Sequence, residues 1–215
     1  MKSGILWDLD GTLLDTLEDL QDATNYALRQ HGLPERTLEE VRRFVGNGAR
    51  NLIIRAVEGK ADADQVLETF RAYYNTHCQI KTRPYDGIPD ALEVLGKEYP
   101  MAVVSNKPDS AVESLCAQYF PGLYARGESA ACPRKPAPDM VYQAMEAIGV
   151  DRCVYVGDSE VVVLTAKNAG VTCLSVLWGF RNRQTLEQAG AAHFCSRATE
   201  LPAMIHQLAE LEANR

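Results

Sequence analysis

The sequence predicts an α/β protein in which a parallel β-sheet, covered by helices on both faces, is interrupted once by an all-helical insertion. Short continuous apolar segments alternate with amphipathic helical segments, which is typical of a buried parallel sheet. Residues 16–83, by contrast, contain helical segments alone. Because the first strand belongs to the alternating pattern, we expect a core made of residues 1–15 and 84–215 and a helical block made of residues 16–83.

The first elements follow from local signals. The apolar segment at residues 4–7 predicts a short buried strand. A helix is expected to begin near Thr16, because Thr16 followed three residues later by Asp19 resembles a capping box. It is expected to end at residues 32–34, where Gly and Pro break the helical pattern. The other helices of the block are predicted at residues 37–45, 49–57 and 61–77.

After residue 84 the pattern changes to alternating strands and helices. Continuous apolar segments predict strands at residues 101–105, 153–158 and 172–178, with a short last strand at 191–195. Amphipathic segments predict helices at residues 88–99, 110–120, 138–149, 160–170 and 200–213.

Composition and charge exclude several classes of function. The chain has 215 residues and a formal net charge of −7, which argues against a nucleic-acid partner or an anionic membrane surface. The start "MKSGILWDLDG" has no long apolar h-region, so no signal peptide is expected, and no window reaches about 18 apolar residues, so no membrane span is expected. The six cysteines form no CxxC pair and are expected to be buried free thiols. These features predict a cytoplasmic location.

Three predicted strands end in polar residues at the sheet edge where open parallel sheets bind ligands. Asp8 and Asp10 follow the first strand, Ser105 and Asn106 end the second, and Asp158 ends the third. The two carboxylates of the first strand point the same way and repel each other, so they require a cation, a proton or water.

A phosphoryl-transfer site is the chemistry that this set of residues indicates. Asp8 and Asp10, together with Asp158, provide the oxygen ligands of a hard divalent cation, and Mg²⁺ suits a site with few carboxylates. Lys135, in the stretch "CPRKPAPD", lies between prolines and adds a positive point charge. A metal, a carboxylate nucleophile, hydroxyl and amide donors and one lysine are the components of phosphoryl transfer.

The stretches that carry these residues resemble the motifs of the haloacid dehalogenase superfamily of phosphohydrolases. They are "DLDGTLLDT", "VVSNKP", "RKPAPD" and "VGDSE…AKNAG", and they occur in the order typical of that family. Within the superfamily the chain is most similar to bacterial phosphoglycolate phosphatases, through "FVGNGAR", "RPYDGI" and "SVLWGFR". The resemblance implies a Rossmann-like core with an inserted helical cap, and Mg²⁺ as the cofactor.

The resemblance also implies a role for each core residue. Asp8 attacks phosphorus and forms an aspartyl-phosphate, while Asp10 protonates the leaving alkoxide and then accepts a proton from the hydrolytic water. Lys135 neutralises charge on the phosphoryl group and holds Asp8, and Asp158 binds Mg²⁺ together with Asp8 and the backbone carbonyl of Asp10. The phosphoryl group is expected to be bound by Gly11, Thr12, Ser105, Asn106 and Lys135.

In the helical block, a glycine-rich turn is the candidate for binding a small anion of the substrate. Gly46, Asn47 and Gly48 precede a helix, so their backbone amides could face a carboxylate, and Arg50 lies on the first turn of that helix. Without the resemblance, the same turn is equally consistent with a plain connection between helices.

One position departs from the family pattern. The stretch "GDSEV" is usually followed by a second acid that supports the metal, and here position 162 is valine. The departure puts metal affinity and activity in question.

The predicted function is a Mg²⁺-dependent phosphomonoesterase that acts on a small anionic phosphate ester, phosphoglycolate by preference, as a monomer or homodimer. Two alternatives stay open. One is a broad-range sugar or nucleotide phosphatase, a pyrophosphatase or a phosphomutase. The other is a catalytically weakened binding protein of the same fold, which Val162 suggests.

Overall fold

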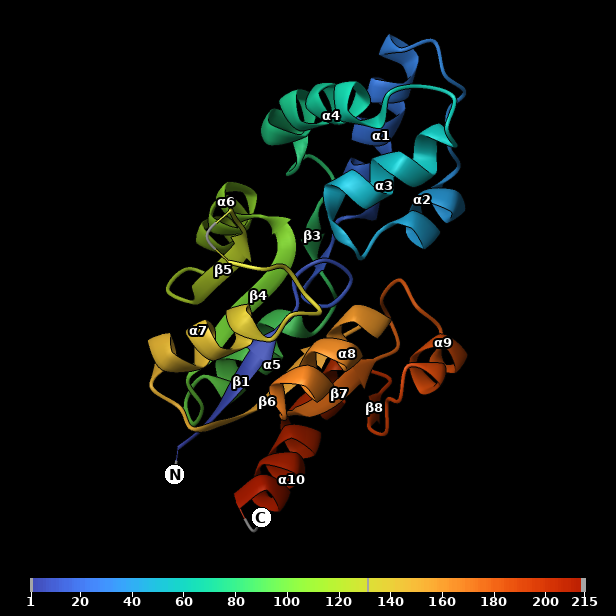
Figure 1. Cartoon of the computed structure of the whole chain (residues 1–215). Coiled ribbons are helices and arrows are strands. Elements are labelled where there is room, and N and C mark those ends of the chain that lie inside the picture. The colour runs from blue at the N-terminus through green and yellow to red at the C-terminus, as the bar shows by residue number, and fades with distance from the viewer. Residues whose placement is uncertain (1, 131, 214–215) are drawn as a thin grey trace. The chain divides into compact units, whose positions relative to one another are not determined.

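The structure, a computed structural model, describes residues 2–130 and 132–213, and in it the chain divides into two compact units (Figure 1). Met1–Leu14 and Pro84–Arg215 form one, called the core unit, and Asp15–Arg83 forms the other, called the helical unit. The boundaries that the sequence predicts, after residues 15 and 83, lie within one residue of these divisions.

Within the described residues, six strands form one parallel sheet in the order β5-β4-β1-β6-β7-β8. The central strand β1 (Ser3–Trp7) pairs with β4 (Met101–Pro108) on one side and with β6 (Arg152–Gly157) on the other. The outer strands are β5 (Tyr124–Glu128), β7 (Thr172–Val176) and β8 (Phe194–Cys195). The predicted α/β class with a parallel, Rossmann-like sheet is therefore confirmed.

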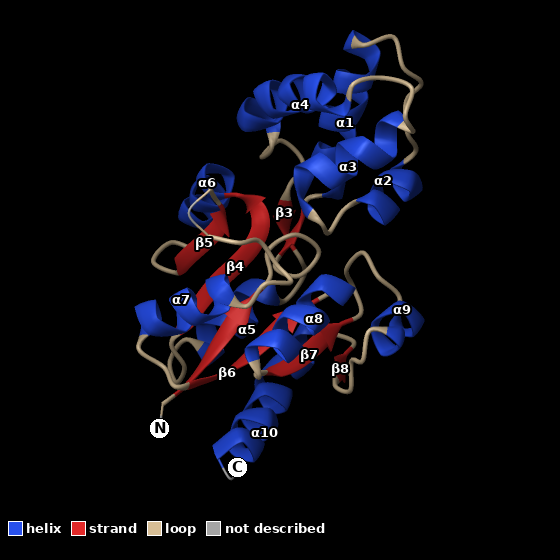
Figure 2. Ribbon diagram, in the orientation of Figure 1, coloured by secondary structure: helices blue, strands red, loops and turns tan. Residues whose placement is uncertain are grey.

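Helices cover both faces of this sheet (Figure 2). Helices α7 (Asp139–Ile148) and α8 (Glu160–Ala169) pack on one face against Leu6 and Tyr155. The opposite face carries α5 (Ile88–Leu95), α6 (Asp109–Tyr119) and α10 (Leu201–Ala213), which pack on Ile5, Trp7 and Val103. Successive residues of a strand point to opposite faces, so a strand buried on both faces must be continuously apolar.

The helical unit consists of α1 (Leu17–Gln30), α2 (Leu38–Phe44), α3 (Gly48–Val57) and α4 (Ala63–His77). The chain enters and leaves this unit through β2 (Leu14–Asp15) and β3 (Arg83–Pro84), which pair with each other.

The predicted capping box at the start of α1 is wrong. Thr16 makes no side-chain capping hydrogen bond. Asp19 instead accepts hydrogen bonds from the backbone N–H groups of Lys81 and Thr82, at 3.0 and 2.8 Å, where the chain returns to the core unit. The Asp19 carboxylate, which the local sequence pattern predicted to cap α1, therefore binds a segment that is distant in the sequence instead. A capping box does occur at α2, between Thr37 and Glu40.

Among the described residues, three elements that lie wholly in the core unit were not predicted. They are β5 at the sheet edge, the short helix α9 (Arg183–Gln188) and a 3₁₀ turn at Ala198–Glu200. None of the described helices is long and apolar enough to cross a membrane.

The six cysteines are free, five of them buried and Cys173 partly buried. Burial raises the pKa of Cys116 to about 12, with a smaller contribution from Asp10, and burial raises the pKa of both Cys173 and Cys195 to about 11. These three thiols are therefore neutral near pH 7 and are poor nucleophiles.

Candidate active site

The predicted site residues of the core unit lie on three neighbouring strands. Because β1 lies between β4 and β6, the carboxyl ends of these strands bring Asp8, Ser105 and Asp158 to one edge of the sheet. The backbone N–H of Asp8 donates to the carbonyl of Val156 at 2.8 Å, which extends the β1–β6 pairing up to the first carboxylate. All three side chains are buried.

Asp8 and Lys135 form a buried ion pair. The Nζ atom of Lys135 lies 2.8 Å from Oδ1 of Asp8 and also donates to the carbonyl of Val104 at 3.1 Å. The backbone N–H of Leu9 donates to the same Oδ1 at 2.8 Å. Burial raises the pKa of Asp8 against the opposing effect of the Lys135 ammonium. The lysine therefore compensates a carboxylate that burial alone would disfavour.

Asn106 fixes the loop that carries Lys135. Its side-chain amide donates to the carbonyl of Lys135 at 3.0 Å, and its side-chain oxygen accepts from the backbone N–H of Lys135 at 2.8 Å. The side chain of Asn106 is thus used in positioning Lys135. Its predicted contact with a phosphoryl oxygen stays a prediction.

Ser105 is buried and its hydroxyl binds the backbone of its own strand. Its Oγ accepts a hydrogen bond from the backbone N–H of Lys107 at 3.2 Å, while a hydroxyl also carries one proton to donate. The side chain is buried in the second half of β4, and its contact with a phosphoryl oxygen stays a prediction.

Backbone hydrogen bonds within residues 9–14 fix the conformation of the loop that follows β1. Gly11 has a positive φ of 78°, and its N–H donates to the carbonyl of Leu14 at 2.9 Å. The N–H of Thr12 donates to the carbonyl of Leu9 at 3.3 Å, and Oγ1 of Thr12 lies 3.5 Å from Oδ1 of Asp158. These contacts hold Gly11 and Thr12 close to Asp158, and their phosphate-binding role stays a prediction.

The segment after β7 approaches the same loop closely. Phe180 donates its backbone N–H to Oδ2 of Asp158 at 2.7 Å, and Nε1 of Trp178 donates to the carbonyl of Thr12 at 3.1 Å. A Cβ atom built on Gly179 would overlap both Asp158 and the carbonyl oxygen of Gly11. Phe180 is buried and Trp178 packs against the core cluster, and both also bind groups at the site: the carbonyl of Thr12 and the carboxylate of Asp158.

The donor set fits a hard cation such as Mg²⁺. Burial, and secondarily the charge of Asp8, raise the pKa of Asp158 to about 7. A cation beside these buried carboxylates would relieve both effects. A Cβ atom on Gly11 would overlap Oδ2 of Asp158, so glycine keeps this position clear. No group of three His, Cys, Asp or Glu side chains within residues 2–130 and 132–213 encloses a metal alone.

Lys107 is a member of the site that the sequence analysis did not assign. Its Nζ lies 2.8 Å from Oδ1 of Asp10, and the two side chains are 3% and 17% exposed. A lysine just after a strand end resembles a solvent-exposed residue, so the sequence offered only its position after Ser105 and Asn106 as a signal.

Val162 lies on the first turn of α8 and is fully buried. It packs in the cluster that contains Leu6 and Tyr155, and a Cβ on Gly157 would overlap it. Glu160, the neighbouring acid on α8, binds Arg181 at 2.8 Å. The position that usually holds an acid is therefore part of the apolar core.

The predicted anion-binding turn lies within the helical unit. Asn47 is the N-cap of α3, and its carbonyl accepts a hydrogen bond from Asn51 at 2.8 Å. Nε of Arg50 lies 2.9 Å from Oδ1 of Asp64, and both side chains are exposed. The roles of Gly46, Asn47, Gly48 and Arg50 in binding substrate stay predictions.

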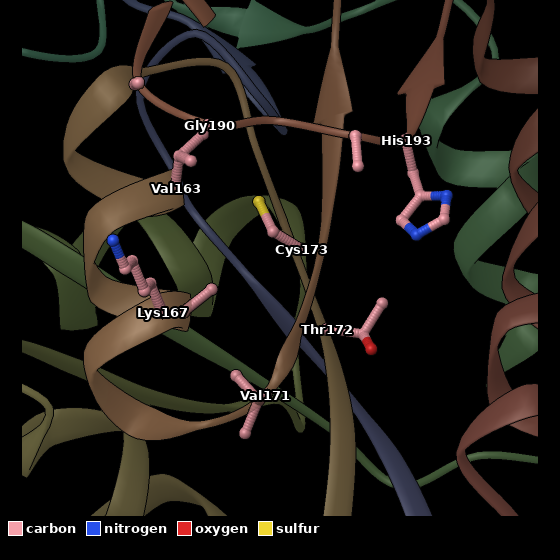
Figure 3. A pocket seen from close by; sticks show the side chains of 10 residues that line it. Val163, Lys167, Val171, Thr172, Cys173, Gly190 and His193 are labelled. Carbon is pink, nitrogen blue, oxygen red and sulfur yellow. The ribbon is translucent and has the colours of Figure 1, made fainter. Parts of the chain in front are cut away.

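A separate hollow of about 330 Å³ lies between α8, the start of β7 and the segment before β8 (Figure 3). Its lining is mainly aliphatic, including Val163 and Val171, with Lys167 and His193 as its basic residues. It contains none of the predicted site residues, and we assign no function to it.

Comparison with known proteins found a matching family model and similar proteins that cover most of this chain. The family model of haloacid dehalogenase-like hydrolases matches residues 5–176. Phosphoglycolate phosphatase 1 of Pseudomonas aeruginosa is 31% identical over 96% of this chain and 81% of its own length. The phosphoglycolate phosphatase of Mesorhizobium japonicum is 33% identical over 92% of this chain and 93% of its own length.

A solved structure agrees with these relatives. The crystal structure of a candidate phosphoglycolate phosphatase from Lactobacillus delbrueckii subsp. bulgaricus superposes with a TM-score of 0.88 at 38% identity. The match covers 95% of this chain and 99% of that one. The similarity therefore extends over both units rather than over the nucleophile motif alone.

Proposed function

The chain belongs to the haloacid dehalogenase-like hydrolase family, and from this premise we propose that it is a Mg²⁺-dependent phosphatase that hydrolyses a small anionic phosphate monoester. The named relatives indicate a phosphatase, and phosphoglycolate is the preferred substrate of the proposal. The observation that carries the proposal is the buried Asp8–Lys135 pair beside Asp158 at the carboxyl edge of the sheet. A cytoplasmic location stays a prediction.

Asp8 is the proposed nucleophile. Lys135 and the N–H of Leu9 both bind Oδ1, so Oδ2 is the oxygen we assign to attack on phosphorus. The ester P–O bond breaks as the Asp8–phosphorus bond forms, and Asp10 gives a proton to the departing alkoxide. Ser105 donates to a phosphoryl oxygen, and the Lys135 ammonium offsets the charge that develops there.

Hydrolysis of the aspartyl-phosphate completes the proposed reaction. Water attacks phosphorus and gives a proton to Asp10, and the electron pair of the broken bond returns to Asp8. Asp8, Asp158 and the backbone carbonyl of Asp10 would hold Mg²⁺, which supplies positive charge at the phosphoryl group when bound.

The helical unit is proposed to act as the cap that selects small substrates. Support comes from its position as an insertion after β1 and from its glycine-rich turn at the start of α3. Backbone N–H groups at a helix N-terminus favour an anion such as the carboxylate of phosphoglycolate.

The decisive experiment measures phosphate release from a panel of metabolites with and without Mg²⁺, using full-length protein. We expect Mg²⁺-dependent release, fastest from phosphoglycolate. Release from many sugar phosphates and nucleotides at similar rates would favour the broad-range alternative, and transfer without net release would favour a phosphomutase. An inactive wild-type protein that still binds phosphate esters would favour the binding-protein alternative.

A further inference from the structure

We propose that Lys107 is a positioning residue for Asp10, and that it aims the Asp10 carboxylate at the water that hydrolyses the aspartyl-phosphate. The inference rests on the proposed phosphatase function. It adds to that function a residue that supports the second half of the reaction.

The first support is the geometry of the pair. Nζ of Lys107 lies 2.8 Å from Oδ1 of Asp10, and only 3% of the lysine side chain is exposed. An ion pair on an open surface contributes little, because solvent and side-chain entropy oppose it. A pair this close and this well covered forms a charge-assisted hydrogen bond with a defined direction.

The second support is the place of Lys107 on the strand that carries Ser105. It belongs to β4, and its backbone N–H donates to Oγ of Ser105 at 3.2 Å. Asp10, in contrast, lies in the loop between β1 and β2. The lysine therefore links a residue on that loop to the strand that presents Ser105.

The third support is the parallel with the first carboxylate. Asp8 is bound by Lys135 and Asp10 by Lys107, each at 2.8 Å, so each of the two site aspartates has its own ammonium. The two lysines come from different segments, one from the loop before α7 and one from the end of β4. Asp8 and Asp10 can therefore be oriented independently of each other. Independent orientation suits two carboxylates that have different proposed roles.

The expected consequence falls on the hydrolytic half-reaction. In that step the water–phosphorus bond forms, the bond from phosphorus to Asp8 breaks, and a proton passes from water to Asp10. A misdirected Asp10 slows this step. p-Nitrophenyl phosphate isolates it, because nitrophenolate leaves without needing a proton, so the first half-reaction does not depend on Asp10.

The test is rapid-mixing kinetics of Lys107→Met with p-nitrophenyl phosphate in saturating Mg²⁺. We expect a burst of about one nitrophenolate per enzyme, followed by a steady rate that is 10- to 100-fold below wild type, a range typical of supporting residues. Lys107→Arg keeps the charge and should recover most of the steady rate. Lys97→Met, which removes an exposed lysine of the core unit, should match wild type.

The outcomes separate this inference from the proposed function. A Lys107→Met enzyme with unchanged steady rate, or one whose burst is lost together with the steady rate, overturns the positioning role. Thermal melting of each variant shows whether it is folded, and Lys107→Arg gives a second measurement if Lys107→Met unfolds. A wild-type protein that hydrolyses no phosphate ester instead defeats the proposed function itself.

Discussion

At the scale of single residues, Asp8 is the side chain on which the proposed chemistry depends most directly. Asp8→Asn keeps the shape but removes the negative charge that attacks phosphorus, so we expect turnover to fall by at least ~10³-fold. Phosphate release in saturating Mg²⁺ measures this. Asp90→Asn, on an exposed position of α5, is the matched control and should keep the wild-type rate. A folded Asp8→Asn enzyme with more than a tenth of that rate would exclude Asp8 as nucleophile.

Gly179 gives a second prediction at this scale. Its Cβ would overlap Asp158 and the carbonyl oxygen of Gly11, both of which belong to the site. Gly179→Ala should therefore displace them, and a shift of about 1 Å in a site costs on the order of 10²-fold in rate. Gly32→Ala is the control for backbone strain without overlap, because Gly32 has a φ of +66° but a Cβ there meets no atom within 4 Å. Equal activity in the two variants would show that the close approach at Gly179 is not required.

Val162 gives a third prediction at the scale of single residues. An acid at this position should orient metal-bound water, so we expect Val162→Asp to lower the Mg²⁺ concentration for half-maximal activity by about 10–100-fold and to raise the maximal rate. Because Val162 is fully buried, an ionised carboxylate there should also lower the free energy of unfolding, by more than the about 1–3 kcal/mol that a neutral polar group costs.

The matched control is Val162→Thr, which has the same shape but no charge. Activity as a function of Mg²⁺ concentration and thermal melting are measured on wild type and both variants. Titration curves that coincide for all three proteins would mean that position 162 does not act on the metal site.

The sequence was enough to predict which polar residues follow the strands, but it did not show which other residues their side chains contact. Asp8, Ser105 and Asp158 follow apolar segments, so their shared sheet edge could be predicted from strand pattern alone. The contacts of Asn106 with Lys135, and of Lys107 with Asp10, depend on which loops meet in space. Long-range pairing of this kind leaves no periodic signal in one sequence.

At the scale of elements, the connection between α1, α2 and α3 depends on Arg36. Its buried guanidinium donates to the carbonyl of Ala56 at 2.9 Å and binds Glu58 at 2.9 Å. Asn25 of α1 binds the backbone of Arg36 on both its N–H and its carbonyl. Arg36 thus joins α1, through its backbone, to the C-terminal end of α3, through its side chain, and Glu58 is its charged partner.

This pair predicts a pH dependence. Hydrogen bonds from Arg36, and secondarily from Lys60, lower the pKa of Glu58 to about 2, from a reference value of 4.5. A depressed carboxyl pKa means that the stabilisation is complete above the unfolded-state value and is lost as pH falls from about 4.5 to about 2. Glu58→Gln should lack this component.

The measurement is the difference in melting temperature between wild type and Glu58→Gln, from pH 7 down to pH 2. We expect the difference to be constant above pH 5 and to shrink below it. Glu68→Gln, on the exposed surface of α4, is the control for removing a carboxylate. A difference that stays constant to pH 2 would show that the Arg36 contact does not depress the pKa of Glu58.

Element prediction succeeded where the apolar pattern was long and failed where it was short. Strands β1, β4, β6 and β7 are continuous apolar segments and were expected within a few residues. Strand β5, with the sequence YARGE, carries Arg and Gly and pairs on one side only, so its pattern is weak. β2 and β3 have two residues each, too few for any periodicity.

At the scale of the whole molecule, the insertion pattern predicts that the core unit folds without the helical unit. Both apolar clusters of the core draw their buried members from the core unit, between Ile5 and Leu208. The helical unit in turn buries its own set, including Leu20, Ile53 and Phe70. Joining Leu14 to Pro84 by a short flexible linker is feasible because β2 and β3, where the chain crosses between units, pair with each other.

Deletion of residues 15–83 should therefore leave a cooperatively folded protein that retains Asp8, Lys135 and Asp158. Its preference for phosphoglycolate over larger esters should collapse, because the proposed cap sizes the pocket and excludes water. Thermal melting tests the fold, and kcat/KM for phosphoglycolate against a bulky sugar phosphate tests selectivity. The same deletion carrying Asp8→Asn is the control for contaminating phosphatase. A folded core that keeps the full-length preference would remove substrate selection from the helical unit and assign it to the sheet edge.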